Sequence, residues 1–196
     1  MSLIDVPAGQ LAAVVTYLEM RTRPANLTVP SSPLALRRLR PTPSDYRDLF
    51  RAVGAPWLWF SRLILRDSAL RAIIDHPGVE LFAVRDGDAI VGMLELDRRV
   101  AGECELAFVG LIPAYAGLGH GRWLLADAVA RAWSGTTGRI HVHTCSLDHP
   151  AALGAYRRAG FAAVARKLET FIDPRLADIL PRESAPQIPL VERPGS

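Results

Sequence analysis

The sequence predicts a single α/β domain of the α+β type, with a mixed, mostly antiparallel sheet and helices on both of its faces. The chain has 196 residues, of which 49% are apolar, which suits one hydrophobic core rather than two. Between residues 33 and 172, apolar residues alternate in some stretches and keep helical spacing in others. An Asp-Gly pair within Arg85–Asp88 is typical of an antiparallel hairpin, whereas the later strand–helix–strand order requires a parallel crossover.

Residues 1–32 are expected to be an N-terminal extension with a strand and a linker. The stretch Leu11–Met20 has apolar residues that also fit a helix, but its β-branched run Val14-Val15-Thr16 favours an additional strand. The linker, Arg23–Pro33, is rich in Pro, Ser and Thr.

The first half of the predicted domain, residues 33–172, starts with a strand at Leu34–Leu39, which Pro41 and Pro43 end. Ser44 is a suitable N-cap for a helix that runs to about Val53. The remaining elements of this half are two short helical pieces and the two strands of the hairpin: Trp57–Leu65, Ser68–Ile74, Val79–Val84 and Ala89–Leu96.

The second half begins with a third antiparallel strand, Glu103–Ile112, and a glycine-rich loop that opens a helix over Arg122–Trp133. After a strand at Ile140–Cys145, Asp148 or His149 is the expected N-cap of a helix with Pro150 in its first turn. Ala159-Gly160 ends that helix before the last strand, Phe161–Phe171. Residues 173–196 carry five prolines, at 174, 181, 186, 189 and 194, which predicts a C-terminal tail with one helical turn near Leu176–Leu180.

Composition excludes several classes of function. The longest apolar runs, Ala55–Phe60 and Ala107–Pro113, fall far short of the ~18 residues that cross a bilayer. No secretory signal starts the sequence, so we expect a cytoplasmic protein that does not bind membranes. Cys104 and Cys145 fit neither a disulfide framework nor a zinc spacing, and we expect no metal.

The net charge of +3 is not gathered into a block, since the densest basic cluster is Arg37-Arg38-Leu39-Arg40. We therefore expect no nucleic-acid partner. The basic residues other than Lys167 are all arginine, a skew that is typical of GC-rich codon usage and hints at a bacterial source.

A glycine-rich loop, Ala116-Gly117-Leu118-Gly119-His120-Gly121, lies between a predicted strand and a predicted helix. Its N–H groups and the helix dipole form a cradle that suits a pyrophosphate. A dinucleotide fingerprint is excluded because Arg122 stands where the third glycine belongs, and a P-loop is excluded because Gly-Lys-Ser/Thr is absent. The alternative is a tight turn without a ligand.

A second motif follows at Ala152-Leu153-Gly154-Ala155-Tyr156-Arg157-Arg158-Ala159-Gly160-Phe161. Together the two motifs resemble the GNAT superfamily of N-acetyltransferases, whose pattern Gln/Arg-x-x-Gly-x-Gly/Ala falls on Ala116–Gly121. The family's Ala-x-x-x-Tyr-x-x-x-Gly-Phe falls on Ala152, Tyr156, Gly160 and Phe161. The resemblance covers about residues 33–171, including the order of strands.

The resemblance implies acetyl-CoA as the co-substrate, lying where the strands Glu103–Ile112 and Ile140–Cys145 splay apart. Main-chain groups of Val109, Gly110 and Leu111 would pair with the pantetheine amides. The loop residues Gly117, Leu118, Gly119, His120 and Gly121 would hold the pyrophosphate. Ala116 departs from the family's Arg/Gln, so Arg122 either replaces that side chain or is simply solvated.

The family also implies the catalytic groups. A tyrosine on the helix after the fifth core strand protonates the thiolate, and the register makes it Tyr156. A glutamate six residues before the end of the fourth strand takes the acceptor's proton, and counting back from Leu111 gives Glu105. Strict alternation puts Glu105, Ala107, Val109 and Leu111 on one face. Glu95 and Asp97 are competing bases or amine-recognition groups.

Three further side chains are candidates for binding the acceptor. Trp57, Trp59 and Arg62 fall in the region that shapes the acceptor pocket in this fold, as an aromatic wall with a carboxylate clamp or as packing residues. In a helix, Trp59 and Arg62 would share a face. His141 and His143 are interpreted as sheet residues, and Cys145 as a structural thiol, which favours direct transfer.

These observations predict an acetyltransferase that moves an acetyl group from acetyl-CoA to a primary amine of a small molecule. Two alternatives stay open: a CoA-binding sensor without turnover, and an enzyme that acetylates protein N-termini or lysines. Whether the chain is a monomer or a homodimer also stays open.

Overall fold

The computed structural model describes residues 3–192, so the ends of the chain, including Pro194 of the predicted tail, lie outside the described residues. The elements follow in the order β1 (Gln10–Met20), β2 (Ala35–Arg38), α1 (Pro43–Gly54), η1 (Ala55–Trp57), α2 (Asp67–Ile74), β3 (Val79–Asp86), β4 (Ala89–Asp97), β5 (Glu103–Leu111), η2 (Pro113–Tyr115), α3 (His120–Ala132), β6 (Arg139–Cys145), α4 (Ala152–Arg158) and β7 (Ala162–Ile172). Within the described residues, no helix is long and apolar enough to cross a membrane.

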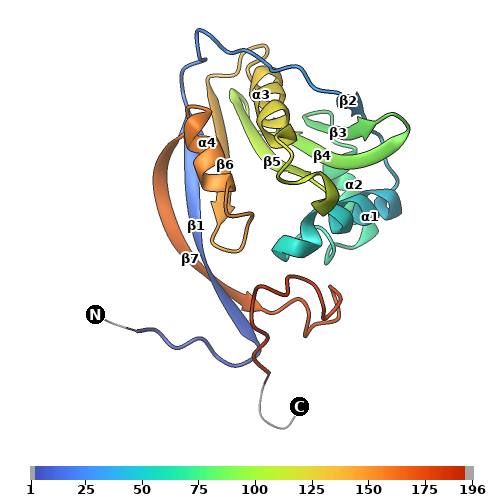
Figure 1. Ribbon diagram of the computed structural model, residues 1–196, viewed down its shortest axis with the longest axis vertical. Coiled ribbons are helices and arrows are strands. Elements are labelled where there is room, and N and C mark those ends of the chain that lie inside the picture. The colour runs from blue at the N-terminus through green and yellow to red at the C-terminus, as the bar shows by residue number, and fades with distance from the viewer. Residues whose placement is uncertain (1–2, 193–196) are drawn as a thin grey trace.

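One seven-stranded sheet in the order β2-β3-β4-β5-β6-β1-β7 forms the centre of the molecule (Figure 1). Neighbouring strands are antiparallel except β5 and β6, which are parallel. The predicted mixed sheet is confirmed, and so is the additional N-terminal strand. That strand, β1, lies between the last two strands of the chain, β6 and β7.

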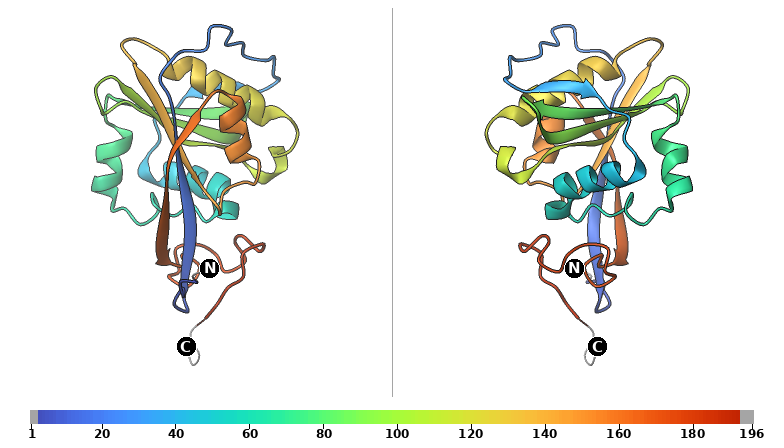
Figure 2. Two further views of the ribbon diagram at one scale, coloured as in Figure 1. Left: turned by 90° about the vertical axis from the view of Figure 1, so that its left-hand side faces the viewer. Right: turned by 90° about the vertical axis from the view of Figure 1, so that its right-hand side faces the viewer.

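Helices cover both faces of the sheet, as predicted (Figure 2). The core on one face is built around the apolar side of α3, including Leu124, Ala128 and Val129. The core on the other face is built around α1 and α2, through Tyr46, Phe50 and Leu70. The sheet thus separates two hydrophobic layers, and each layer fixes the helices next to one face of the site.

Helix α1 begins earlier than predicted, because its N-cap is Thr42 and not Ser44. The Thr42 hydroxyl accepts from the Asp45 N–H, and the Asp45 carboxylate accepts from the Thr42 N–H, which is a reciprocal capping box. Helix α3 likewise begins at His120, two residues before the predicted start.

The predicted helix over Trp57–Leu65 is wrong. After η1 the chain turns at Leu58, which has a left-handed backbone with φ of 55°, and continues as a loop. The turn brings Trp59 back onto the end of α1, where its N–H donates to the Gly54 carbonyl. A Cβ on Gly54 would lie 2.5 Å from the Cβ of Trp59, so this packing requires glycine. Trp59 and Arg62 therefore do not share a helical face.

A β-bulge in β5 corrects the predicted alternation. Glu95 pairs with Phe108, and Leu96 pairs with Leu106, so Ala107 is an extra residue in β5. The bulge exchanges the two faces of the strand. Leu106 before it and Val109 after it both pack on the α3 side. Glu105 therefore shares its face with Phe108, not with Val109 and Leu111.

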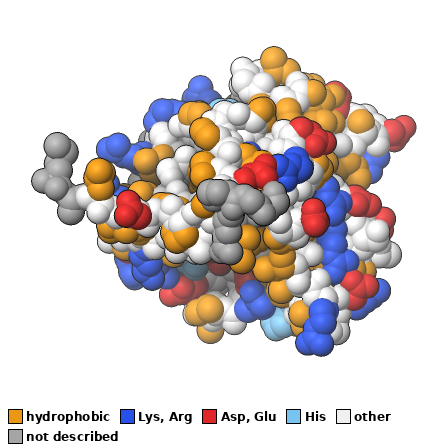
Figure 3. All heavy atoms as spheres, turned by 90° about the horizontal axis from the view of Figure 1, so that it is seen from below, with side chains coloured by type: hydrophobic (Ala, Val, Ile, Leu, Met, Phe, Trp, Pro, Cys, Tyr) orange, Lys and Arg blue, Asp and Glu red, His pale blue; other side chains and the backbone are white. Residues whose placement is uncertain are grey.

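The proline-rich C-terminal segment packs against the domain over its described part. Leu180 and Ala185 are buried with Leu58 of the loop after η1. A buried ion pair joins Asp173 to Arg175, whose guanidinium also donates to the carbonyls of residues 184, 185 and 188. The expected helical turn is a series of tight turns that starts at Asp173. Seen from this end of the molecule, hydrophobic side chains are interspersed with charges of both signs (Figure 3).

Candidate active site

A cleft opens where β5 and β6 diverge. The two strands pair only from Glu103 to Glu105 on β5 and from Arg139 to His141 on β6, and beyond these residues they separate. The cleft has a volume of about 1400 Å³ and is lined by both strands, α3, α4, the loop after η1 and the linker near residue 26. The predicted splay is thus present, and Glu105 lies at the point where it begins.

The glycine-rich loop forms one end of this cleft. Gly117 and Gly119 have positive φ values of 78° and 87°, and Gly119 is the N-cap of α3. A Cβ at Gly117, Gly119 or Gly121 would meet no atom within 4 Å, so the loop leaves open space in front of the helix N-terminus. Because the first N–H groups of a helix lack intrahelical partners, this open N-terminus offers hydrogen-bond donors to an anion.

The other predicted donor-site residues lie around this end of the cleft. Val109, Gly110, Leu111 and Arg122 line it, whereas Leu118 points largely into solvent and the ring of His120 lies beside Tyr115. Beyond Glu105, the edge of β5 that faces β6 has no strand partner. Its main-chain groups at residues 109–111 are therefore free to pair with amides of a ligand.

Tyr156 projects from α4 into the cleft. Burial, and secondarily the negative charge of Asp148, raise the pKa of the Tyr156 hydroxyl far above its ordinary value. Its ring packs edge-on against Phe161. The hydroxyl therefore keeps its proton at neutral pH and can give it to a stronger base that forms beside it.

Neither Asp148 nor His149 is the N-cap of α4, and Pro150 precedes the helix, which corrects the prediction. The N-cap is Ala151, without a side-chain hydrogen bond, and α4 begins at Ala152. The Asp148 carboxylate instead accepts from the Thr144 hydroxyl and the Cys145 N–H, at 2.7 and 2.8 Å. It also accepts from Nε1 of Trp59 at 3.0 Å. Asp148 thus ties the loop after β6 to the loop after η1.

The two predicted tryptophans, Trp57 and Trp59, both line the cleft. Trp59 is held by Asp148 and packs against Phe108, with ring centroids 5.2 Å apart. The Trp57 ring lies edge-on to His149 at 5.0 Å. At the far end of this wall, Phe60 contacts Phe171 of β7. The aromatic wall that the sequence indicated is therefore assembled from a loop and the last strand, not from a helix.

Arg62 forms an ion pair within the protein. Its Nη2 lies 2.7 Å from Oε1 of Glu95, and the other carboxylate oxygen of Glu95 accepts from the Tyr46 hydroxyl. Glu95 is fully buried, with 0% of its surface exposed, and Arg62 is 15% exposed as a side chain. Burial and the Glu95 charge raise the pKa of Tyr46. The charge of Arg62 is thus balanced by Glu95, while its side chain lines the cleft and its Nε has no hydrogen-bond partner among the described residues.

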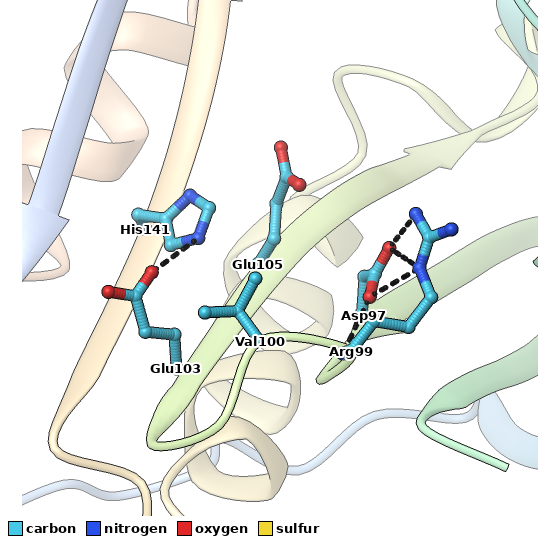
Figure 4. Close-up of a pocket in the computed structure, with 6 residues that line it drawn as sticks. All are labelled: Asp97, Arg99, Val100, Glu103, Glu105 and His141. Carbon is cyan, nitrogen blue, oxygen red and sulfur yellow. Dashed lines mark hydrogen bonds and ion pairs between the residues drawn. The ribbon is translucent and has the colours of Figure 1, made fainter.

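Glu105 lies between two pairs of oppositely charged residue types, His141–Glu103 and Asp97–Arg99 (Figure 4). Its carboxylate points away from both pairs. These residues surround a small pocket of about 210 Å³. The Glu105 carboxylate is paired with His143, whose Nδ1 lies 3.2 Å from Oε1. This contact lowers the pKa of Glu105 and raises that of His143. Asp97 is held by Arg99, which lowers its pKa against the effect of burial.

Two cleft residues escaped the sequence reasoning. His143 was interpreted as a plain sheet residue, and Asp148 as a helix cap. Both lie past the point where β5 and β6 separate. The alternation of polar residues near the end of β6 could have indicated His143, whereas Asp148 lies in the loop after the strand. Cys145 also lines the cleft, and burial raises the pKa of its thiol to about 11, which keeps it protonated and poorly nucleophilic.

Within the described residues, no group of three or more His, Cys, Asp or Glu could hold a metal ion.

Comparison with known proteins agrees with this geometry. The profile of the acetyltransferase (GNAT) family matches residues 42–161. No protein of curated function matches the chain. A GNAT-family acetyltransferase structure from Novosphingobium aromaticivorans is 17% identical, with a TM-score of 0.54 over 85% of this chain and 68% of that one.

Two further structures are similar in the same way. A GCN5-related N-acetyltransferase from Kribbella flavida is 20% identical, with a TM-score of 0.53 over 87% of this chain and 63% of that one. A Bacillus subtilis acetyltransferase solved in complex with CoA is 18% identical, with a TM-score of 0.52 over 67% of this chain and 78% of that one. The chain thus spans about two thirds of the Novosphingobium and Kribbella proteins.

Proposed function

This chain belongs to the GNAT family of acetyltransferases, and from that premise we propose that it transfers an acetyl group from acetyl-CoA to the primary amine of a small molecule. One observation carries the proposal. A single cleft is lined by the glycines at 117, 119 and 121, by Tyr156 and by the Glu105–His143 pair. A donor that enters along β5 would thus have its reactive end between a proton donor and a proton acceptor.

The donor site suits a long, flexible molecule with an anionic end. The cradle would hold the pyrophosphate, and the free edge of β5 at residues 109–111 would pair with the amides of the pantetheine arm. Acetyl-CoA, when bound, supplies an activated thioester carbonyl. The Bacillus subtilis neighbour, which was solved with CoA, supports the choice of donor, as does the resemblance at Ala116–Gly121.

The reaction needs a deprotonated amine and a protonated leaving group. The Glu105–His143 pair would take up the acceptor's proton, and Tyr156 would give a proton to the departing thiolate, because its raised pKa keeps that proton in place until then. The free N–H groups on the edge of β5 can stabilise the oxyanion that forms in between. Since the Cys145 thiol is protonated, we favour direct transfer without an acetyl-enzyme.

The acceptor side of the cleft suits a cationic amine with an apolar or aromatic body. Its walls include Trp57, Phe60 and Phe171, and its carboxylates include Glu105 and Glu169. The nearby guanidinium of Arg62 is neutralised by buried Glu95. An acceptor carboxylate there would meet the carboxylates of Glu105 and Glu169 and an arginine whose charge Glu95 already balances, so we expect uncharged bodies to be preferred over amino acids.

A thiol-release assay with acetyl-CoA tests this function. The panel contains arylalkylamines, the matching amino acids, and peptides with a free N-terminus or lysine. We expect release with the arylalkylamines, at least 10-fold slower release with the amino acids, and only background release with peptides. Release with peptides alone would replace the proposal by a protein acetyltransferase. Thermal stabilisation by CoA without release from any acceptor would replace it by a sensor.

A further inference from the structure

Two histidines on β6 face two glutamates on β5, and only one of these pairs opens into the cleft. His141 lies 3.5 Å from Glu103, within the stretch where the strands are still hydrogen-bonded. His143 lies 3.2 Å from Glu105 and lines the cleft together with it. The pairs also differ in their contacts, because Glu103 accepts from Arg139 at 2.7 Å and meets Nε2 of His141, whereas Glu105 meets Nδ1 of His143. Of the two pairs, Glu105–His143 is the one that lines the cleft.

The contact between the pair leaves one ring nitrogen free. Nδ1 of His143 faces the Glu105 carboxylate, so in the neutral ring that nitrogen carries the hydrogen and Nε2 carries the lone pair. The His143 side chain is 49% exposed, whereas that of Glu105 is 29% exposed. Tyr17 of β1 packs against the imidazole, with ring centroids 5.9 Å apart, and fixes its tilt. The imidazole is therefore the more accessible member of the pair and is held in one orientation.

The charges around the imidazole determine where a proton resides. Glu105 on β5, Asp148 in the loop after β6 and Glu169 on β7 all stabilise the protonated ring, and Glu105 contributes most. Two groups of other kinds face the pair: His141 on the same strand, which acts on the charge of Glu105, and Lys167 of β7, whose amine lies over the Tyr17 ring. Glu105 is the weaker base of the pair, because His143 stabilises its charged form. A proton that reaches this pair is therefore held by the ring nitrogen and not by the carboxylate.

We propose that His143 is the general base of the transfer, acting through Nε2, and that Glu105 is its positioning residue. This assignment rests on the proposed function and changes the role that the family resemblance gave to Glu105. The acceptor ammonium loses one proton to Nε2, and the free amine then attacks the thioester carbon, so that a C–N bond forms and an oxyanion appears. The C–S bond breaks as the oxyanion collapses. Tyr156 protonates the thiolate, and the second proton of the amine nitrogen restores the Tyr156 hydroxyl. The imidazolium returns its proton to solvent.

The pH dependence of kcat/KM separates this assignment from one in which Glu105 is the base. We expect wild-type kcat/KM to decrease as the pH drops below a midpoint that lies above the ordinary histidine pKa of about 6.5. This decrease is the acidic limb of the profile. The variant His143→Gln should lose about 10²–10⁴-fold in kcat/KM and should lose this limb. In Glu105→Gln the limb should remain and move to lower pH, since the charge that raises the pKa of His143 is gone. His141→Gln is the matched control and should keep the wild-type profile.

Two further measurements make the outcome decisive. Repeating the profile with two acceptors of different pKa identifies any limb that belongs to the amine, because only that limb moves with the acceptor. An NMR titration of the His143 ring, assigned with His143→Gln, should give a midpoint above about 6.5 that drops in Glu105→Gln. This readout does not require turnover.

The proposal is overturned if His143→Gln retains its limb and most of its activity, or if Glu105→Gln is the variant that loses the limb. It is also overturned if the NMR midpoint of His143 lies at or below the ordinary value. These results would leave acetyl transfer itself intact. Absence of thiol release by the wild type with every amine would instead remove the proposed function, and the base assignment with it.

Discussion

In the proposed reaction, the hydroxyl of Tyr156 protonates the departing thiolate. We expect Tyr156→Phe to lower kcat by roughly 10- to 1,000-fold, around or below the usual range for acid–base catalysis, because water can partly replace the donor. KM for acetyl-CoA should move little, since the ring remains to pack against Phe161. Steady-state kinetics check this. A Phe variant as active as the wild type would show that Tyr156 only packs.

Arg62 is predicted to act on stability and not on substrate choice. Arg62→Ala would leave the Glu95 carboxylate buried without its cation, which typically costs about 3–5 kcal/mol. In a chain of this size that lowers the melting temperature by roughly 6–20 °C. The double variant Arg62→Met/Glu95→Leu removes both charges and should recover most of the loss.

The same variants also test whether Arg62 binds the acceptor. The ratio of kcat/KM for an amino acid to that for its amide should stay unchanged in Arg62→Ala. A selective loss on the amino acid, at an unchanged melting temperature, would restore Arg62 to the role of carboxylate clamp.

The functional residues differ in how far the sequence alone could identify them. Tyr156 and the three glycines of the loop belong to motifs with fixed local spacing, and the structure brings them into one cleft. The Arg62–Glu95–Tyr46 network joins residues up to 49 positions apart. Its members could not be paired by local spacing, and the helix assumed for Arg62 does not form.

The loop before α3 should tolerate no side chain at Gly119. With a φ of 87° this position strains any β-branched residue, and a Cβ there would project into the open cradle. We expect Gly119→Val to abolish the rise in melting temperature that acetyl-CoA causes by binding the native state. Differential scanning fluorimetry with and without the ligand measures this rise.

A matched control for that variant is Gly102→Val in the turn between β4 and β5. Gly102 has a φ of 77°, and a Cβ there would also meet no atom within 4 Å, but the residue does not line the cleft. It should lose similar stability and keep the full shift with acetyl-CoA. If both variants kept the shift, or if ATP or NADH shifted the wild type and CoA did not, the cradle would be assigned to the wrong ligand.

Most strands and helices were predictable because their signals are local. The Asp-Gly turn and the alternation around it predicted the hairpin of β3 and β4. The N-cap of α1 is local too, since Thr42 and Asp45 form a reciprocal capping box, but Ser44 two residues later offers a competing hydroxyl. The bulge at Ala107 was not predictable in this way, because alternation assumes a regular strand and the extra residue is defined only by its partners on β4.

The N-terminal strand is a structural part of the domain rather than an extension. β1 fills the space between β6 and β7 and buries Val15, Leu18 and Met20. Burial of three such side chains contributes about 5–9 kcal/mol, comparable to the whole stability of a typical domain. A chain that starts at Arg21 should therefore not unfold cooperatively, as thermal melts followed by circular dichroism would show. A cooperative melt within a few degrees of the full chain would contradict this.

Where β1 lies could not be predicted from its sequence. The β-branched run predicted a strand, but its neighbours are more than 100 residues away in the chain, and nothing local specifies them. The position of β1 also affects the cleft. Tyr17 of β1 packs on His143. The strand β7, which pairs with β1, contributes Glu169 and Phe171 to the lining of the cleft. The long pairing of β1 with β7 thus places the end of β7 beside the cleft.

Acetyl transfer to an amine in this cleft is tested most directly by mass spectrometry of one reaction mixture of acetyl-CoA and an arylalkylamine. Free CoA and acetylated amine are both quantified over time. We expect the two products in equal amounts at every time point, with no acetylated enzyme, and both formed more slowly by Tyr156→Phe. Free CoA without acetylated amine, or no turnover by a protein that still binds acetyl-CoA, would contradict it.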